Sequence, residues 1–136
     1  MRNSRYRFSR LVMVVAAIVF FGVGCYAIAQ PEAHLAQLGL AANDQAVWTQ
    51  LFMGVILLGL AIHQTTTSRY AADPAFRRAA LLSILIHVAL AFVMYIAPGE
   101  TTRIRWSVIS VNGAFAFLYL VTLPIKSIGY HEEKVS

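Results

Sequence analysis

The sequence carries little charge for its length. Only 12% of its 136 residues are charged, whereas 59% are hydrophobic. A soluble domain carries about 25% charged and about 45–50% apolar residues. Low charge excludes a disordered chain, and a chain this short cannot bury so much apolar surface in a soluble core. We therefore expect a single membrane domain over residues 1–136, with lipid facing the apolar excess.

The sequence also lacks the residues that most chemistry needs. It has one cysteine, Cys25, so no disulfide can form within the chain. No glycine-rich phosphate-binding pattern is present, and no serine has a base and a carboxylate to activate it. The long apolar runs contain no Asp, Glu or Lys, which argues against a metal site or an ion relay. We expect no catalytic residue, metal or cofactor.

What the sequence does have is four long apolar runs. Each approaches the about 20 residues with which a helix crosses a bilayer. They comprise residues 11–29, 46–64, 78–98 and 104–124. Barrel strands would alternate between apolar and polar residues, and these runs do not. The pattern predicts an all-α membrane protein, an antiparallel four-transmembrane-helix bundle, with a connector helix on the outer surface over about 31–42.

Helix-start and helix-end signals separate the runs. Pro31 follows the first run, and Asn43 or Asp44 can cap the second. Asp73 followed by Pro74 is typical of a helix start, with the aspartate as the cap. Pro98 with Gly99, and then Pro124, close the third and fourth runs. The first run resembles a secretory signal because Ala27-Ile28-Ala29 imitates a cleavage site. Its length and the following proline favour a retained span.

The basic residues are distributed unevenly between the two sides. Arg2, Arg5, Arg7, Arg10, Arg69, Arg77, Arg78, Lys126 and Lys134 lie on one side, and Arg103 and Arg105 lie on the other. This bias predicts that both termini are cytoplasmic. Because the basic residues are split among three segments without an aromatic platform, we do not expect nucleic-acid binding. The lipid bilayer is the expected partner.

His87 stands in the middle of the third run, where an ionisable group is costly. Ala79, Ser83, His87, Ala91 and Tyr95 recur every four residues and predict a stripe that faces protein. Gln50, Ser83, His87, Asn112 and Tyr119 are candidates for one buried polar cluster. Two interpretations remain open: hydrogen bonds that hold helices together, or a polar-bottomed cavity for a small quinone-like lipophile.

Glycines offer candidate points of close helix approach. They are Gly22, Gly24, Gly54 and Gly59. Neither pair has the four-residue spacing of a strong dimer motif, so self-association is possible but not indicated. Haem ligation needs two histidines at equal depth, and His34, His63, His87 and His131 supply no such pair. A haem-b electron carrier is therefore the third hypothesis.

The order of elements resembles the DoxX-like group of small bacterial four-helix membrane proteins. The resemblance covers residues 8–124 and rests on Arg10, on "QPEAHLAQLGL", on "LFMGVILLGLAI", on the arginine-bearing turn and on the polar-dotted fourth run. It implies the fold and a multi-pass place in a bacterial inner membrane, and it assigns no catalytic residue. Some relatives are accessory parts of oxidoreductases. We therefore expect a non-catalytic subunit or assembly partner of other membrane proteins, with lipophile binding around His87 as the alternative.

Overall fold

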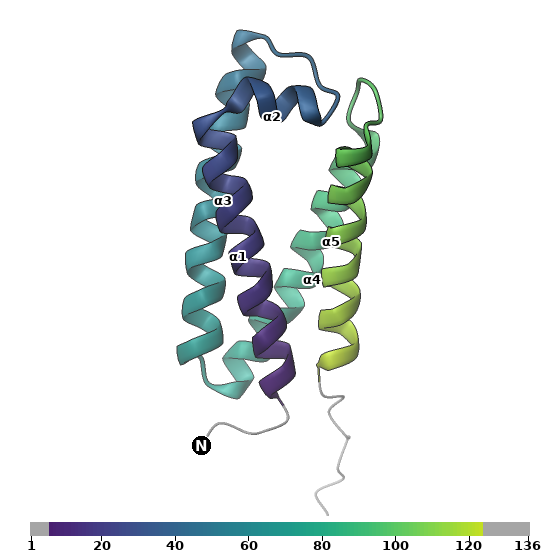
Figure 1. Cartoon of the computed structure of the whole chain (residues 1–136). Helices are drawn as coiled ribbons and strands as arrows, with labels where there is room; N and C mark the ends of the chain where they lie inside the picture. Colours follow the sequence, from purple (N-terminus) through teal and green to yellow (C-terminus); the bar gives the residue numbers. More distant parts are fainter. Residues whose placement is uncertain (1–5, 124–136) are drawn as a thin grey trace, which may run out of the picture.

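All regular secondary structure in residues 6–123, which the computed structural model describes, is helical (Figure 1). The helices are α1 (Arg7–Ala29), α2 (Pro31–Gln37), α3 (Asp44–Tyr70), α4 (Asp73–Ile96) and α5 (Arg103–Thr122). By length and composition, α1, α3, α4 and α5 can each cross a membrane. The all-α class is thus confirmed, and so is the prediction of four helices long and apolar enough to cross a membrane.

Two predicted helix ends were wrong. α3 continues past residue 64 to Tyr70, because its polar last turns pack against α1 and Arg10 binds their carbonyl oxygens. The connector helix stops at Gln37 instead of residue 42. Gly39 ends it with a φ of +73°, a left-handed conformation that side chains disfavour. Pro124 lies outside the described residues.

The predicted helix cap was confirmed for α3 and was wrong for α4. Asn43 caps α3 as predicted, since its Oδ1 accepts a hydrogen bond from the Ala46 amide at 2.8 Å. Asp73 does not cap α4, because Ala72 takes that position and Asp73 is the first helical residue. The Asp73 carboxylate instead forms an ion pair with Arg10 at 3.0 Å. The carboxylate thus contacts a residue that is distant in the sequence.

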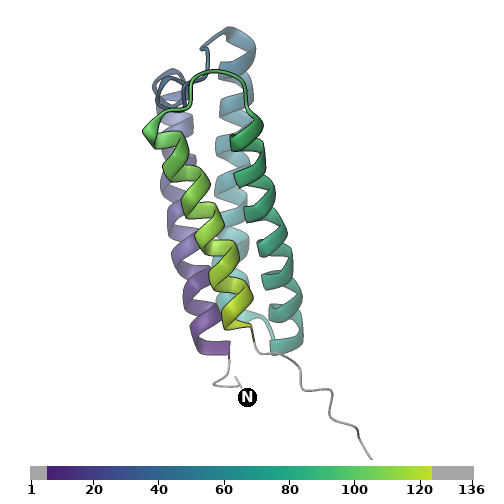
Figure 2. The same cartoon turned by 90° about the vertical axis from the view of Figure 1, so that its right-hand side faces the viewer.

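The four long helices lie in two pairs, α1 with α3 and α4 with α5 (Figures 1 and 2). The first pair approaches closely at Gly24 and Gly54, where a Cβ on Gly24 would lie 2.9 Å from the Gly54 carbonyl oxygen. Gly22 and Gly59 have nothing within 4 Å of such a Cβ. Within the chain, close approach therefore occurs at one glycine from each helix, and the other two face outward.

Packing between the pairs is concentrated at the end of the bundle where α1 begins. We call this end the opposite end, because α2 lies at the other end of the bundle. Met13, Phe76 and Tyr119 are fully buried there, and they come from three different helices. Toward the other end, which we call the α2 end, the two pairs diverge (Figure 1). Large apolar side chains such as Phe52 and Leu85 are exposed along the outer faces, as lipid contact requires.

Candidate functional site

A cavity of about 740 Å³ lies between the two helix pairs at the α2 end. α2 and the loop after it border the cavity, together with the last turns of α4. Its walls are mostly aliphatic and come from all four long helices, for example from Val23, Met53, Leu90 and Val108. Pockets of about 300–1,000 Å³ with such walls are the usual size and character of small-molecule sites.

Polar groups reach the cavity at two depths. Gln50 and His34 lie near α2, whereas Asn112 lies farther along α5, close to Phe115 at the deep end. All three polar side chains are largely buried, at 8% exposure each. Within residues 6–123, no Asp, Glu, Lys or Arg lines the cavity. The site is therefore polar but uncharged.

Asn112 is held by two hydrogen bonds in a single orientation. Its amide nitrogen donates to the Val108 carbonyl at 2.9 Å, and that oxygen can only accept. The Asn112 oxygen therefore faces His87, whose Nδ1 lies 2.8 Å away and must donate. This arrangement fixes the tautomer of the neutral imidazole, and it leaves the second amide N–H of Asn112 without a partner among residues 6–123.

His87 lies behind the cavity wall and does not line it. Its side chain is fully buried between the rings of Phe20 and Phe115, at centroid distances of 5.0 and 5.1 Å. Its Nε2 has no hydrogen-bond partner among the described residues. The prediction that His87 faces protein is confirmed, but the cavity is adjacent to it and not around it.

Ser83 and Tyr119 lie on the far side of His87 from the cavity, and neither lines it. The Tyr119 ring packs 5.9 Å from the imidazole, and its hydroxyl faces Ser83 without reaching hydrogen-bond geometry. The Ser83 hydroxyl donates to the Ala79 carbonyl of its own helix at 3.0 Å. These two residues extend the polar core around His87 toward the opposite end.

Gln50 does not join His87, contrary to the predicted single cluster. It pairs with His34 of α2, and Gln50 Nε2 lies 2.8 Å from His34 Nδ1. His34 is buried and packs edge-on against Tyr26 with centroids 5.3 Å apart. The spacing of His34, Leu35 and Leu38 along one face of α2 was a signal for this burial, since all three are buried.

Burial also changes the chemistry of His34. Removal from water disfavours the charged imidazolium and lowers the pKa of His34 below its ordinary value of 6.5. At neutral pH the ring is uncharged and can accept a hydrogen bond from Gln50. The pair therefore fastens α2 to α3 with neutral groups.

α2 is also fastened to the loop between α4 and α5. The Glu100 amide donates to the Gly39 carbonyl at 3.1 Å, and the Thr102 hydroxyl donates to the Gln37 carbonyl at 2.5 Å. Where the two loops cross, Gly39 and Gly99 both have positive φ, and a Cβ on either would collide with the other loop. This crossing closes the α2 end over the cavity.

Arg105 supports the rim of the cavity, although the sequence marked it only as a charge on the outer side. It is 2% exposed, and its Nε donates to the Met94 carbonyl at 2.7 Å. Its other nitrogens donate to the carbonyls of Ala97, Pro98 and Glu100. The guanidinium thus satisfies carbonyl oxygens that the end of α4 leaves without helical partners.

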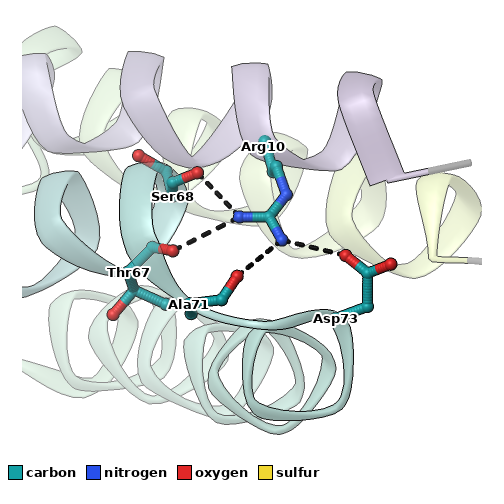
Figure 3. Close-up of polar contacts among 5 residues, drawn as sticks. All are labelled: Arg10, Thr67, Ser68, Ala71 and Asp73. Carbon is teal, nitrogen blue, oxygen red and sulfur yellow. Dashed lines mark hydrogen bonds and ion pairs between the residues drawn. The ribbon is translucent and has the colours of Figure 1, made fainter. Parts of the chain in front are cut away.

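Arg10 does the same for α3 at the opposite end of the protein (Figure 3). Its guanidinium donates to the Ser68 and Ala71 carbonyls, both at 2.8 Å, and to Asp73. It also lies 4.3 Å from the centroid of the Phe76 ring. A positive charge at a helix C-terminus complements the helix dipole, so Arg10 joins α1 to the α3–α4 turn.

The predicted stripe on α4 was partly wrong. Phe76, Ala80, Ser83 and His87 are buried, but Tyr95 is 66% exposed. A strict four-residue repeat drifts around a helix of 3.6 residues per turn, so buried positions alternate steps of four and three. Tyr95 therefore faces outward.

The histidines on described helices occupy three separate environments. His34 is on α2, His63 is exposed on α3, and His87 is in the core; His131 lies outside the described residues. In residues 6–123, no group of three or more His, Cys, Asp or Glu side chains could hold a metal ion.

This chain was compared with family models, curated proteins and solved structures, and none of them matches it. The resemblance to the DoxX-like group therefore stays an expectation.

Proposed function

We propose that this protein binds a small, neutral lipophilic molecule in the cavity at the α2 end. The observation that carries the proposal is the cavity itself, about 740 Å³ between two helix pairs whose shared core lies toward the opposite end. Apolar clefts between the helices of a bundle are common sites for small ligands. The aliphatic walls favour an apolar body, and the Gln50 and Asn112 amides favour a polar group on it.

Charge supports the neutral class of ligand. The described lining holds no ionised side chain, and a charged ligand would lose its hydration there without a compensating partner. A quinone-like molecule or another uncharged lipid-soluble compound meets this condition. No residue at the site is arranged as a nucleophile with a base, so the proposal is binding without catalysis.

The proposal includes a place in the cell. The four long helices cross a bacterial inner membrane in alternating directions, with both termini in the cytoplasm and α2 on the outer side. The uneven distribution of arginine and lysine supports this orientation. The cavity then lies in the outer half of the bilayer, where a lipophile can enter from the membrane.

The experiment is purification of the tagged full chain from its native membrane in mild detergent, followed by mass spectrometry of extracted small molecules. We expect one uncharged lipophile to be enriched over a membrane protein purified in parallel. Leu90→Trp fills the cavity and should abolish the enrichment. Leu85→Trp, on the same helix but 65% exposed and outside the cavity lining, is the matched control and should retain it. No enrichment in the unmodified chain would overturn the proposal.

The same purification tests the subunit hypothesis. Stoichiometric partner proteins would support a place in a larger complex, and a Soret absorption band would support haem. Among the described residues, no surface feature distinguishes a protein-binding face from a lipid-facing one, because apolar side chains are exposed on every long helix. The cavity is the more specific feature, and for that reason we place ligand binding first.

A further inference from the structure

The hydrogen-bonding capacity of the cavity is unequal at its two depths. Near α2, Gln50 uses one amide N–H on His34 and keeps both an oxygen and a second N–H. At the deep end, the Asn112 oxygen is turned to His87, outside the lining, and one N–H is used on Val108. The deep end therefore offers the remaining N–H of Asn112.

The hydroxyl groups of the lining do not add to this donor. The Thr49 hydroxyl donates to the Gln45 carbonyl at 2.8 Å, and the Ser107 hydroxyl donates to the Arg103 carbonyl at 3.0 Å. Both hydrogens are thus used within their own helices. A buried N–H without an acceptor is unfavourable, so an occupant that supplies an acceptor oxygen at this depth gains over one that does not.

We infer that the cavity selects lipophiles that carry a hydrogen-bond-accepting oxygen at their deep end, a carbonyl above all, which accepts from the free N–H of Asn112. His87 is the positioning residue, because its bond to the Asn112 oxygen prevents the amide from presenting that oxygen to the ligand. This inference rests on the proposed function, and it adds the chemical class and the orientation of the ligand.

The rigidity of His87 makes this selection effective. The imidazole is stacked between Phe20 and Phe115 and fully buried, so it cannot rotate away from Asn112 without disturbing both rings. Phe20 and Phe115 also line the cavity beside Asn112. The apolar contact and the single donor are therefore presented together, by groups that hold one another in place.

The test uses two probes, a long-chain methyl ketone with a ¹³C-labelled carbonyl and the alkane of the same length. The full chain in detergent should bind the ketone about threefold to tenfold more tightly than the alkane, as one net hydrogen bond allows. In infrared spectra, the carbonyl band of the bound ketone should lie at lower frequency than the band of the same ketone in micelles without protein. Asn112→Leu should remove both effects, and the cavity-lining control Thr49→Val should keep them.

Variants of His87 test positioning. His87→Phe preserves the ring stack but frees the amide, so the shifted carbonyl band should broaden or disappear while alkane binding is unchanged. His87→Asn restores a donor near Nδ1 and should recover the band. If Asn112→Leu does not fold, Asn112→Ala serves instead, because it removes the N–H and adds no new donor.

The outcomes distinguish the proposed function, lipophile binding, from the inferred selection for an acceptor oxygen. Binding of neither probe overturns the proposed function. Equal binding of ketone and alkane with an unshifted carbonyl band overturns this inference and leaves the cavity as a lipophile site. A shifted band that persists in Asn112→Leu also overturns the inference, since another donor would then hold the ligand.

Discussion

The imidazole of His87 donates a hydrogen bond to the side-chain oxygen of Asn112 over 2.8 Å, and this bond joins α4 to α5 far from either end of the bundle. Polar side chains of facing helices form hydrogen bonds across helix pairs in lipid. The bond thus links the packing of the α4–α5 pair to the deep end of the cavity, which Asn112 lines.

Loss of this bond should cost little stability. Replacing His87 with Leu is expected to lower the free energy of unfolding by about 1 kcal/mol, since interhelical hydrogen bonds in membranes average about 0.6 kcal/mol and a ring stack is lost as well. Unfolding in mixed micelles measures this change, with Asn112→Leu completing a double-mutant cycle. A coupling of zero would contradict an interhelical bond, and outright unfolding would show that His87 holds more than one helix pair.

The contact of Gly24 with Gly54 should not tolerate a methyl group. A Cβ on Gly54 would lie 2.6 Å from Ile28 Cγ1, so Gly54→Ala should force α1 from α3 and cost about 1–3 kcal/mol. Gly59→Ala, with open space around it, is the matched control and should be neutral or slightly stabilising. Thermal unfolding in detergent compares the two variants. If Gly59→Ala instead changed the oligomeric state, a second copy would be indicated at that face.

The Arg10 network should dominate the stability of the opposite end. Arg10→Met removes the donors from the α3 carbonyls and also removes the ion pair with Asp73, a carboxylate that is 22% exposed. We expect a loss of about 3 kcal/mol, in the range for breaking a largely buried pair. Arg7→Met, an exposed arginine on the same helix, is the control. Equal midpoints of chemical unfolding for the two variants would contradict the structural role of Arg10.

The docking of α2 should depend on pH. Burial lowers the pKa of His34 below 6.5 in the folded state. The stabilisation from neutral His34 is therefore complete above pH 6.5, and it is lost as pH falls through the folded-state pKa. Amide hydrogen exchange in α2 should therefore accelerate below pH 6.5, after correction for the intrinsic rate. In His34→Gln, the hydrogen-exchange rate of the α2 amides should not show this pH dependence. A dependence that survived the substitution would contradict the role of His34.

Much of the helical framework was predictable because its signals are local. The apolar runs and caps such as Asn43 lie within a few residues of the structure that they specify. The errors arose where distant residues replaced local partners. Asp73 binds Arg10 instead of capping α4, and the end of α3 stays helical because Arg10 satisfies its carbonyls.

The candidate site was predictable only in part, since Gln50 and Asn112 line the cavity but Ser83, His87 and Tyr119 do not. His87 and Asn112 meet as expected, because both stand near the middle of adjacent helices joined by a short loop. Gln50 instead forms a hydrogen bond with His34, because α2 folds back over the helix ends and places His34 next to Gln50. The burial of Arg105 depends on the loop at the end of α4, which sequence patterns describe poorly.

The sequence by itself determined that this protein is helical, that its outer faces are apolar and that polar side chains stand within its long helices. These properties follow from composition and from the need of every backbone group in lipid for a hydrogen bond. Only the tertiary structure decided which helices pair, where they separate and which polar groups meet. Apolar faces are chemically alike, so the choice among them depends on close contacts such as Gly24 with Gly54 and on hydrogen bonds whose geometry exists only after the helices have packed.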